Sequence, residues 1–457
     1  MKKPVYRFIC TSLMVLLSVA SFAFIWLRFV SEHNNTGYLL GYGNIGMALI
    51  IYGVVFVLSG RWFHAFKIGV ERKAKLAAGV VFTIWVTDVI EIFVSMAITG
   101  NFRFFWNFTW RYVLLAAAQS VVLAVLVVIF VSIFWCLFPP IELLVINGGH
   151  KNKLPKKLND IKRKYKVVGS LDYSVPADEL RAALEKAEAV LINDVPASAE
   201  NIILKMCFEL NKRVYVTPKI SDIIVKASEN LNVVDTPLFL CRNQSMSAYQ
   251  RAVKRIFDVV LSFIALIVFS PVLLIVALAI KLEDHGPVFY KQERVTKDDK
   301  RFMILKFRSM IVDAEKDGRP HPAGEKDDRI TKVGRIIRAC RVDELPQLLN
   351  ILKGDMSIIG PRPERVEHVE KYSSEIPEFG FRHKVKGGLT GYAQVYGKYN
   401  TSALDKLKLD LMYITNYSFL LDIQILFETL KILFIKESTE GFDEEMVQEM
   451  HEGGLKK

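Results

Sequence analysis

Residues 112–138 read YVLLAAAQSVVLAVLVVIFVSIFWCLF and contain no Asp, Glu, Lys or Arg. A helix of about 20 apolar residues is long enough to cross the hydrocarbon core of a bilayer, which is about 30 Å thick. This stretch therefore predicts a transmembrane helix, which Pro139 and Pro140 bring to an end. Three further apolar runs precede it, at residues 5–30, 38–60 and 79–98. Residues 1–140 are expected to form a four-helix transmembrane block.

The basic residues orient this block. Lys and Arg gather before the first run, between the second and third runs, and after the fourth run. Because cytoplasmic loops carry an excess of these residues, both ends of the block are expected to face the cytoplasm. The net charge of +12 thus lies beside membrane segments. That placement favours an anionic membrane surface or phosphorylated substrates as partners over nucleic acid.

Strand and helix patterns alternate over residues 141–245. The strand candidates are Ile141–Asn147, Lys166–Leu171, Ala189–Asn193 and Arg213–Val216. Helical patterns separate them, at Lys156–Tyr165, Glu179–Ala187 and Glu200–Leu210. The alternation predicts a cytoplasmic, Rossmann-like α/β domain with a parallel sheet. Gly148-Gly149 leaves nucleotide binding open, but the dinucleotide fingerprint G-x-G-x-x-G is missing, so a structural or regulatory spacer is favoured.

A fifth apolar run, Ile256–Ile280, contains Ser270-Pro271 in its middle. Proline removes a backbone donor and kinks a helix. A full crossing would also place the Lys- and Arg-rich segment that follows outside the cell, against the positive-inside rule. We therefore expect a re-entrant helix over about residues 254–281, with a plain fifth span as the alternative. Residues 246–436 should form a mixed α/β, mostly helical domain, and residues 437–457 a flexible tail.

The acids Asp343 and Glu344 precede four leucines at helical spacing, and Gly354 follows as a helix end. An aspartate at a helix start commonly caps it. On this element alone, capping by Asp343 is the simpler interpretation.

The neighbouring segments favour chemistry at the acid pair. Strand alternation in residues 301–310 places Lys306 and Arg308 on one face. Downstream, Arg362 stands between two prolines, which lowers the entropy lost when it binds a phosphate. One carboxylate could act as a nucleophile and the other could hold Mg²⁺ on a diphosphate. The cations would neutralise charge in the transition state of a phosphoryl transfer.

Several linked motifs extend this pattern over residues 249–436. In order, they are Lys254–Asp258, Ser270-Pro271, Gly286–Phe289, Lys306–Met310, Asp343–Gln347, Gly354–Ser357, Gly360–Pro363, Gly391–Val395 and Leu409-Asp410. With these motifs the segment resembles the polyprenyl-phosphate glycosyl-1-phosphate transferases, also called bacterial sugar transferases. The four-span block and the α/β domain resemble the large-topology members of that family.

The resemblance implies that residues 246–436 are the catalytic domain and that Asp343 is the nucleophile. Asp343 would take the phosphosugar and release a nucleoside monophosphate, while Glu344 would bind Mg²⁺. Polyprenyl phosphate, which is undecaprenyl phosphate in bacteria, would then attack the phosphosugar on Asp343. The other candidate substrate- and phosphate-binding residues are Lys306, Arg308, Arg362, Asp410 and His383.

The same resemblance implies a multi-pass protein of the bacterial inner membrane with its catalytic domain on the cytoplasmic face. The expected donor is UDP-glucose or UDP-galactose, and the product serves exopolysaccharide, capsule or O-antigen synthesis. Membrane lipid is an expected partner, and a homo-oligomer stays open. One departure is Lys386-Gly387-Gly388, where many members have Arg-Pro-Gly. Gly387 gives this loop more conformational freedom than proline would.

Two other functions stay open at this point. A membrane-anchored nucleotide-sugar dehydratase or epimerase would also join spans to α/β domains, but it needs a glycine-rich dinucleotide fingerprint. A non-catalytic scaffold of a polysaccharide assembly complex would use the basic surface to bind lipid. The scaffold leaves Asp343 and Glu344 unexplained.

Overall fold

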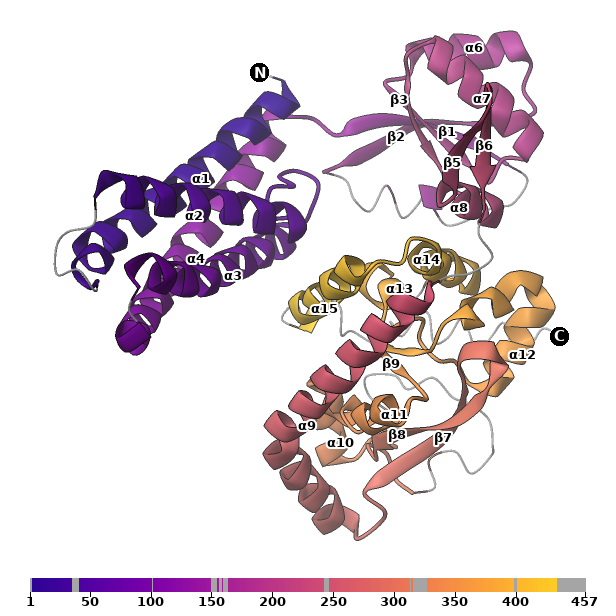
Figure 1. Ribbon diagram of the computed structural model, residues 1–457. Helices are drawn as coiled ribbons and strands as arrows, with labels where there is room; N and C mark the ends of the chain where they lie inside the picture. Colours follow the sequence, from indigo (N-terminus) through magenta and orange to yellow (C-terminus); the bar gives the residue numbers. More distant parts are fainter. Residues whose placement is uncertain are drawn as a thin grey trace. The chain divides into compact units, whose positions relative to one another are not determined.

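The computed structural model describes residues 2–34, 41–100, 102–148, 154–155, 158, 163–241, 246–312, 314, 327–397 and 401–433. The chain divides into two compact units, residues 1–218 and residues 219–457 (Figure 1). Gly149, most of the helix expected at residues 156–165 and the expected tail at residues 437–457 lie outside the described residues.

The first unit begins with a bundle of four helices: α1 (Lys3–Arg28), α2 (Tyr42–Trp62), α3 (Lys73–Thr99) and α4 (Phe105–Leu137). Short 3-10 turns, Val30–Glu32 and Phe102–Phe104, lie between helices. All four helices are long and apolar enough to cross a membrane. They follow the four apolar runs of the sequence, and the chain is a membrane-integral protein.

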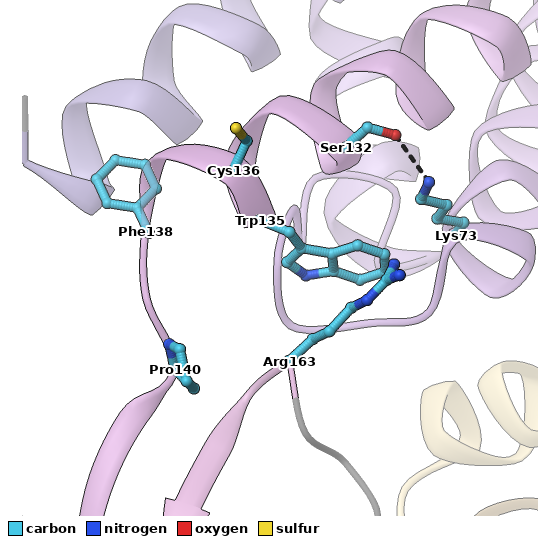
Figure 2. A pocket seen from close by; sticks show the side chains of 7 residues that line it. All are labelled: Lys73, Ser132, Trp135, Cys136, Phe138, Pro140 and Arg163. Atoms are coloured by element: carbon cyan, nitrogen blue, oxygen red, sulfur yellow. Dashed lines mark hydrogen bonds between the residues drawn. The ribbon is translucent and has the colours of Figure 1, made fainter.

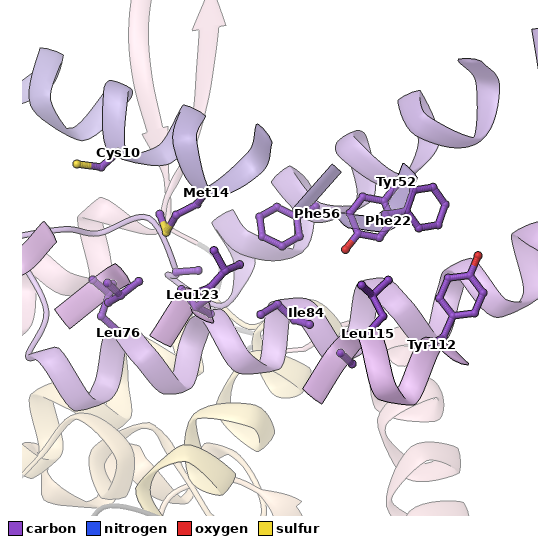
Figure 3. Packing of buried hydrophobic residues seen from close by; sticks show 14 of the residues in the cluster. Cys10, Met14, Phe22, Tyr52, Phe56, Leu76, Ile84, Tyr112, Leu115 and Leu123 are labelled. Carbon is purple, nitrogen blue, oxygen red and sulfur yellow. The ribbon is translucent and has the colours of Figure 1, made fainter. Parts of the chain in front are cut away.

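The bundle core is built from large side chains that all four helices contribute (Figure 3). Phe22 of α1 stacks on Tyr52 of α2 with ring centroids 4.2 Å apart. The Tyr52 hydroxyl donates to Gln119 Oε1 of α4 at 3.1 Å. Each helix thus buries one face against its neighbours and leaves the other apolar face for lipid.

A parallel sheet follows the bundle. Its strands are β1 (Ile141–Asn147), β2 (Tyr165–Asp172), β3 (Ala189–Asn193) and β4 (Arg213–Val216), in the order β2-β1-β3-β4. Every pair is parallel. Helices α6 (Ala177–Lys186) and α7 (Ala197–Glu209) pack on it through Leu184 and Cys207. This confirms the expected α/β domain with a parallel sheet.

The second unit starts with α8 (Ile220–Lys226) and an antiparallel hairpin of β5 (Glu229–Val233) and β6 (Thr236–Leu240). Ile223 of α8 belongs to the core of this unit, where α8 contacts α14 (Ala403–Thr415). The division after Pro218 therefore falls inside the segment 141–245 that we expected to be one domain.

Helix α9 (Ala248–Asp284) is one helix of 37 residues with Pro271 inside it. Figure 1 shows α9 changing direction along its length, and the backbone donor missing at Pro271 accounts for a kink there. Within its most apolar window only 6% of the residues are buried. The helix is longer than the expected segment 254–281, and its path relative to the bilayer stays a prediction.

The rest of the second unit is mixed α/β and mostly helical. Strands β7 (Phe289–Val295) and β8 (Arg301–Phe307) are antiparallel, and β9 (Ser357–Ile359) pairs in parallel with β10 (Gly388–Thr390). The helices are α10 (Lys332–Ala339), α11 (Gln347–Lys353), α12 (Val366–Glu375), α13 (Tyr392–Tyr396), α14 and α15 (Phe419–Leu433), with 3-10 turns at Lys297–Asp299, Val342–Glu344 and Pro377–Lys384. Ile351, Ile359 and Leu407 lie at the centre of the core.

Candidate active site

The acid pair lies in the 3-10 turn Val342–Glu344, just before α11. Arg341 opens this turn with φ +53°. Helix α11 begins at Gln347, its N-cap residue is Pro346, and no side chain caps it. The interpretation of Asp343 as a helix cap is therefore wrong. Asp343 lies inside the 3-10 turn, and the N-cap position of α11 is occupied by Pro346. Gly354 ends α11 with φ +100°, as expected.

Two cations bind the same oxygen of Glu344. Lys306 Nζ and Arg362 Nη2 each lie 2.7 Å from Glu344 Oε1. The three side chains come from β8, the 3-10 turn and the loop after β9. The side chains of Glu344 and Lys306 are only 13% and 18% exposed, whereas Arg362 is 40% exposed. Arg362 is thus the cation that faces outward and can reach a bound phosphate.

This cluster sets the charge state of Glu344. Burial alone would raise its pKa, but the positive charges of Arg362 and Lys306 hold the pKa of Glu344 well below its usual range. Burial lowers the pKa of Lys306, and the carboxylate of Glu344 opposes that change. Glu344 is therefore ionised at neutral pH and orients both cations toward one position.

Asp343 differs from its neighbour. Among the described residues its carboxylate forms no ion pair and no side-chain hydrogen bond. Burial, and then the charge of Glu344, raise the pKa of Asp343 above its usual value, and the cations Lys306, Arg338 and Arg362 oppose the rise. An ionised carboxylate beside three cations and bound by none of them is suited to attack an electrophilic phosphorus.

The loop that carries Arg362 is fixed from behind by Arg382. Arg382 Nη2 donates to the backbone oxygen of Arg362 at 2.9 Å and forms an ion pair with Asp410 Oδ2 at 2.8 Å. Both side chains are almost fully buried. Burial raises the pKa of Asp410 to about 6, against the opposing charge of Arg382. Asp410 therefore contacts the cluster through Arg382 and not directly.

The start of α9 fixes the strand before that loop. Asp258 accepts hydrogen bonds from Ser357 Oγ and from the backbone N–H of Ile358, both at 3.0 Å. One turn earlier, Lys254 forms a buried ion pair with Asp422 at 2.7 Å. The Lys254–Asp258 motif thus connects the apolar helix to β9, which leads directly to Arg362.

Three other predicted site residues lie outside the cluster of Lys306, Glu344 and Arg362. Arg308 is buried and pairs with Asp284 at the end of α9. A Cβ at Gly286 would clash with the guanidinium of Arg308, so a larger residue there would displace this side chain from its place. His383 Nδ1 lies 2.6 Å from Asp299 Oδ1, and burial lowers its pKa. Ser270 Oγ donates to the backbone oxygen of Ile267 at 2.8 Å, one turn back in α9.

Gly387 stands where many members of the resembled family have the proline of Arg-Pro-Gly, and a backbone hydrogen bond fixes its position. Its backbone N–H donates to Thr296 Oγ1 at 3.0 Å, and Thr296 in turn donates to the backbone oxygen of Asp355. A proline at this position has no N–H and would lose the first of these bonds. A glycine at position 387 is therefore less rigid than a proline would be, but it keeps this hydrogen bond to Thr296.

A divalent cation fits the acid pair only together with a ligand. The described residues contain no group of three or more His, Cys, Asp or Glu side chains arranged around one point. Mg²⁺ is commonly held by one or two carboxylates and by substrate phosphates. Glu344 can supply such a carboxylate, so the residues present fit Mg²⁺ that binds with a diphosphate.

Residues 249–436 match a family model described as bacterial sugar transferase. The exopolysaccharide production protein PSS of Rhizobium leguminosarum bv. phaseoli is 40% identical over 196 residues, which cover 41% of this chain and 96% of that relative. The chain belongs to the bacterial sugar transferase family. A Caulobacter vibrioides relative, a UDP-glucose:undecaprenyl-phosphate glucose-1-phosphate transferase, is 41% identical over 191 residues, 40% of this chain and 71% of that relative.

Another relative has a different sugar in its name. The UDP-N-acetylgalactosamine-undecaprenyl-phosphate N-acetylgalactosaminephosphotransferase of Aeromonas hydrophila is 45% identical over 184 residues, 40% of this chain and 43% of that relative. The chain thus spans less than half the length of this relative. The matched segment of this bacterial sugar transferase starts in the first turn of α9 and includes the whole cluster around Glu344.

Sequence reasoning missed Arg382 as a part of the site. Only its neighbour His383 was predicted as a site residue, because the two partners of Arg382, Arg362 and Asp410, lie on other elements. The available signal was the pair Phe379 and Phe381 just before it, since an arginine that follows aromatic residues in a short turn is a candidate for burial.

Proposed function

We propose that this bacterial sugar transferase moves a hexose-1-phosphate from a UDP-sugar to undecaprenyl phosphate and releases UMP. The observation that carries the proposal is the contrast within the acid pair. Glu344 is bound by Lys306 and Arg362, and Asp343 beside it stays available. The printed names of the relatives in Caulobacter and Aeromonas, which include undecaprenyl phosphate and a UDP-sugar, support the substrate class.

In the first half-reaction an Asp343 carboxylate oxygen attacks the phosphorus that bears the sugar. A bond forms between Asp343 and that phosphorus, and the bond to the bridging oxygen of the diphosphate breaks. UMP leaves with that oxygen. Arg362 and Lys306, which both pair with Glu344, would stabilise the negative charge that develops on the phosphoryl oxygens.

In the second half-reaction an oxygen of undecaprenyl phosphate attacks the same phosphorus. The bond to Asp343 breaks, the carboxylate is restored and the polyprenyl-diphospho-sugar leaves. The two substrates therefore bind in turn, and the reaction is ping-pong. Asp343 can act in both halves because no other described side chain binds it in an ion pair.

Mg²⁺ is the proposed cofactor, with Glu344 as the protein group that would hold it. When bound, Mg²⁺ neutralises charge on the diphosphate of the donor. Glu344 keeps one oxygen, Oε1, on Lys306 and Arg362, so its other oxygen would be the one to bind the metal.

The proposed location is the bacterial inner membrane, with the second unit on the cytoplasmic face, where UDP-sugars are made. The basic loops of the four-span block support this orientation. Helix α9 is proposed to enter the membrane and return, with its kink at Pro271. The active site then lies at the membrane surface, within reach of the phosphate of a lipid substrate.

The test uses purified protein, undecaprenyl phosphate, Mg²⁺ and a panel of UDP-glucose, UDP-galactose and UDP-N-acetylgalactosamine. Release of UMP with at least one sugar is expected. Release of UDP would instead identify an ordinary glycosyltransferase. Nicotinamide absorbance in the purified protein would indicate a dehydratase or epimerase. No turnover with any nucleotide-sugar, in protein that is folded and in lipid, would favour the scaffold.

A further inference from the structure

A pocket with a volume of about 500 Å³ lies where the helix bundle meets the parallel sheet of the first unit. Figure 2 shows Trp135 at its centre, with Lys73 on one side and Arg163 below. The side chains come from four places: the first residue of α3, the last turns of α4, the link between α4 and β1, and the segment just before β2. The pocket lies outside the segment matched by the family model.

The pocket lies at the depth of lipid headgroups. Helices α3 and α4 are adjacent and antiparallel, so the start of α3 and the end of α4 occur at the same end of the bundle. A helix of 33 residues such as α4 is about 50 Å long, well beyond the roughly 30 Å of a hydrocarbon core. Its last turns, with Trp135, therefore reach the polar layer, where tryptophan is enriched.

Two cations flank the indole of Trp135. Lys73 Nζ lies 5.2 Å and Arg163 Cζ 4.8 Å from the ring centroid of Trp135. Lys73 also donates to Ser132 Oγ at 2.7 Å. Within the described part of the chain, neither cation forms an ion pair with a carboxylate. An ammonium has three donors and a guanidinium five, so both retain donors for oxygen atoms of a ligand.

We propose that this pocket binds the phosphate headgroup of an anionic glycerophospholipid. The phosphate oxygens accept hydrogen bonds from Lys73 and Arg163 and lie near Ser132. The positive end of the α3 dipole, which begins at Lys73, adds attraction for the anion. Trp135 and Phe138 form the apolar wall along which the first carbons of an acyl chain lie.

A lipid suits this place better than a soluble phosphate compound. The pocket combines cations and a hydroxyl with aromatic walls, and basic pockets between helices on the cytoplasmic side bind lipid headgroups in other membrane proteins. The site is separate from Asp343 and its cluster. The proposal therefore does not depend on the proposed transfer reaction, and binding is measured without any sugar donor.

The experiment measures binding of phosphatidylglycerol to the purified full-length protein by native mass spectrometry in detergent, with phosphatidylcholine as the reference lipid. Wild-type protein is expected to prefer phosphatidylglycerol. The double variant K73Q/R163Q is expected to bind it about 30-fold more weakly, because each basic contact near an anionic surface contributes about a factor of five. The charge-conserving variant K73R/R163K should keep most of the preference.

The matched control is K186Q/K205Q, which removes two exposed lysines from α6 and α7 of the same unit. It is expected to bind phosphatidylglycerol as wild type does. If K73Q/R163Q does not fold, each single variant is expected to bind about fivefold more weakly. A folded K73Q/R163Q protein, or either single variant, with wild-type affinity overturns the proposal.

Two further arms identify the source of the phosphate. Glycerol 3-phosphate and inorganic phosphate are expected not to compete with phosphatidylglycerol at concentrations that match the lipid. Competition that depends on Lys73 and Arg163 would assign the pocket to a soluble phosphate compound and overturn the lipid. Undecaprenyl phosphate that binds more tightly than phosphatidylglycerol, and loses that binding in K73Q/R163Q, would overturn the assignment to a glycerophospholipid.

Discussion

The two units bury charged side chains in different ways. In the second unit the buried ions are paired across the core: Lys254 with Asp422, and Arg382 with Asp410. In the four-helix bundle the buried acids Asp88 and Glu91 of α3 accept no hydrogen bond from any described residue. A buried ion is costly unless a partner compensates it, and in the second unit Arg382 also holds the backbone oxygen of Arg362.

This difference indicates where precise positioning matters. In the second unit Asp258 holds β9, Arg382 holds the loop with Arg362, and Lys254 pairs the start of α9 with Asp422. Asp343 forms no ion pair with any described residue. The bundle has packed aromatic rings and hydroxyl contacts, and none of its described cations joins Asp88 or Glu91. We infer that the second unit carries the chemistry and that the first unit anchors it.

Asp343→Asn is expected to have the largest effect. An amide cannot form the acyl-phosphate, so transfer should fall by about 10⁴-fold or more. The structure removes the competing explanation, because Asp343 caps no helix. The measurement is UMP release, together with trapping of labelled sugar-phosphate on the protein when undecaprenyl phosphate is withheld. Only protein with Asp343 should carry the label.

The control for this variant is Asp405→Asn, which changes a half-buried acid in the first turn of α14. It should release UMP at close to the wild-type rate and should carry the label. Normal turnover by the Asp343→Asn protein, or label on it, would refute the nucleophile.

Glu344→Gln should reduce transfer by about 100-fold, because Lys306 and Arg362 lose the carboxylate that orients them.

The Glu344→Gln change should also move the pH dependence of kcat/KM. Asp343 must be ionised to attack, so activity is lost as the pH falls through its pKa. The charge of Glu344 raises the pKa of Asp343. Removing that charge lowers this pKa, so the acidic limb of kcat/KM should move to lower pH.

The pH measurement has its own control. Glu367→Gln removes an exposed acid of α12 and should leave the acidic limb where it is in the wild type. If the limb of Glu344→Gln does not move either, or moves to higher pH, the group that titrates in the wild type is not Asp343.

Arg382→Lys should reduce kcat by about 10-fold, because a lysine keeps a positive charge but loses the planar guanidinium whose Nη2 contacts both Asp410 and the backbone oxygen of Arg362. Arg382 is thus a positioning residue. In an Arg362→Lys background the same change should cost less, since Arg382 acts through Arg362. Full additivity of the two losses would mean that Arg382 acts by another route, such as general stability.

A truncated protein of residues 219–457 should retain transfer, with a smaller loss than any of these substitutions. It keeps α8, whose Ile223 belongs to the core of the second unit. A shorter protein that starts at Tyr249 loses Ile223 and Met246 from that core and should be less stable. The measurements are UMP release and thermal unfolding in lipid. A folded but inactive 219–457 protein would show that the first unit takes part in catalysis.

Hydropathy and charge in the sequence were sufficient to predict the four spans, the strands Ala189–Asn193 and Arg213–Val216, and the approach of Lys306 and Arg362 to Glu344. These features depend on local composition or on the few partners available to an acid. The ion pair of Arg382 with Asp410 depends on tertiary packing of two distant segments, which no local pattern reveals. The 3-10 turn at Asp343 was missed because Asp343 is also a good residue for a cap.

The last prediction concerns α9 and should change transfer least. Tyr249 and Leu282 lie near its two ends and are exposed, at 77% and 65%. In a cysteine-free background, Tyr249→Cys and Leu282→Cys should leave UMP release close to the wild-type rate. A membrane-impermeant thiol reagent should reach both cysteines only from the cytoplasmic side, because the charge on both flanks and the kink at Pro271 favour a helix that returns.

Pro271→Ala restores a backbone donor and straightens the helix, so it should move Leu282→Cys toward labelling from the opposite side. Labelling of the two positions from opposite sides in protein with Pro271 intact would mean that α9 crosses the membrane. The acid pair, which follows α9 in the chain, would then lie on the far side from Tyr249, away from the cytoplasmic UDP-sugar.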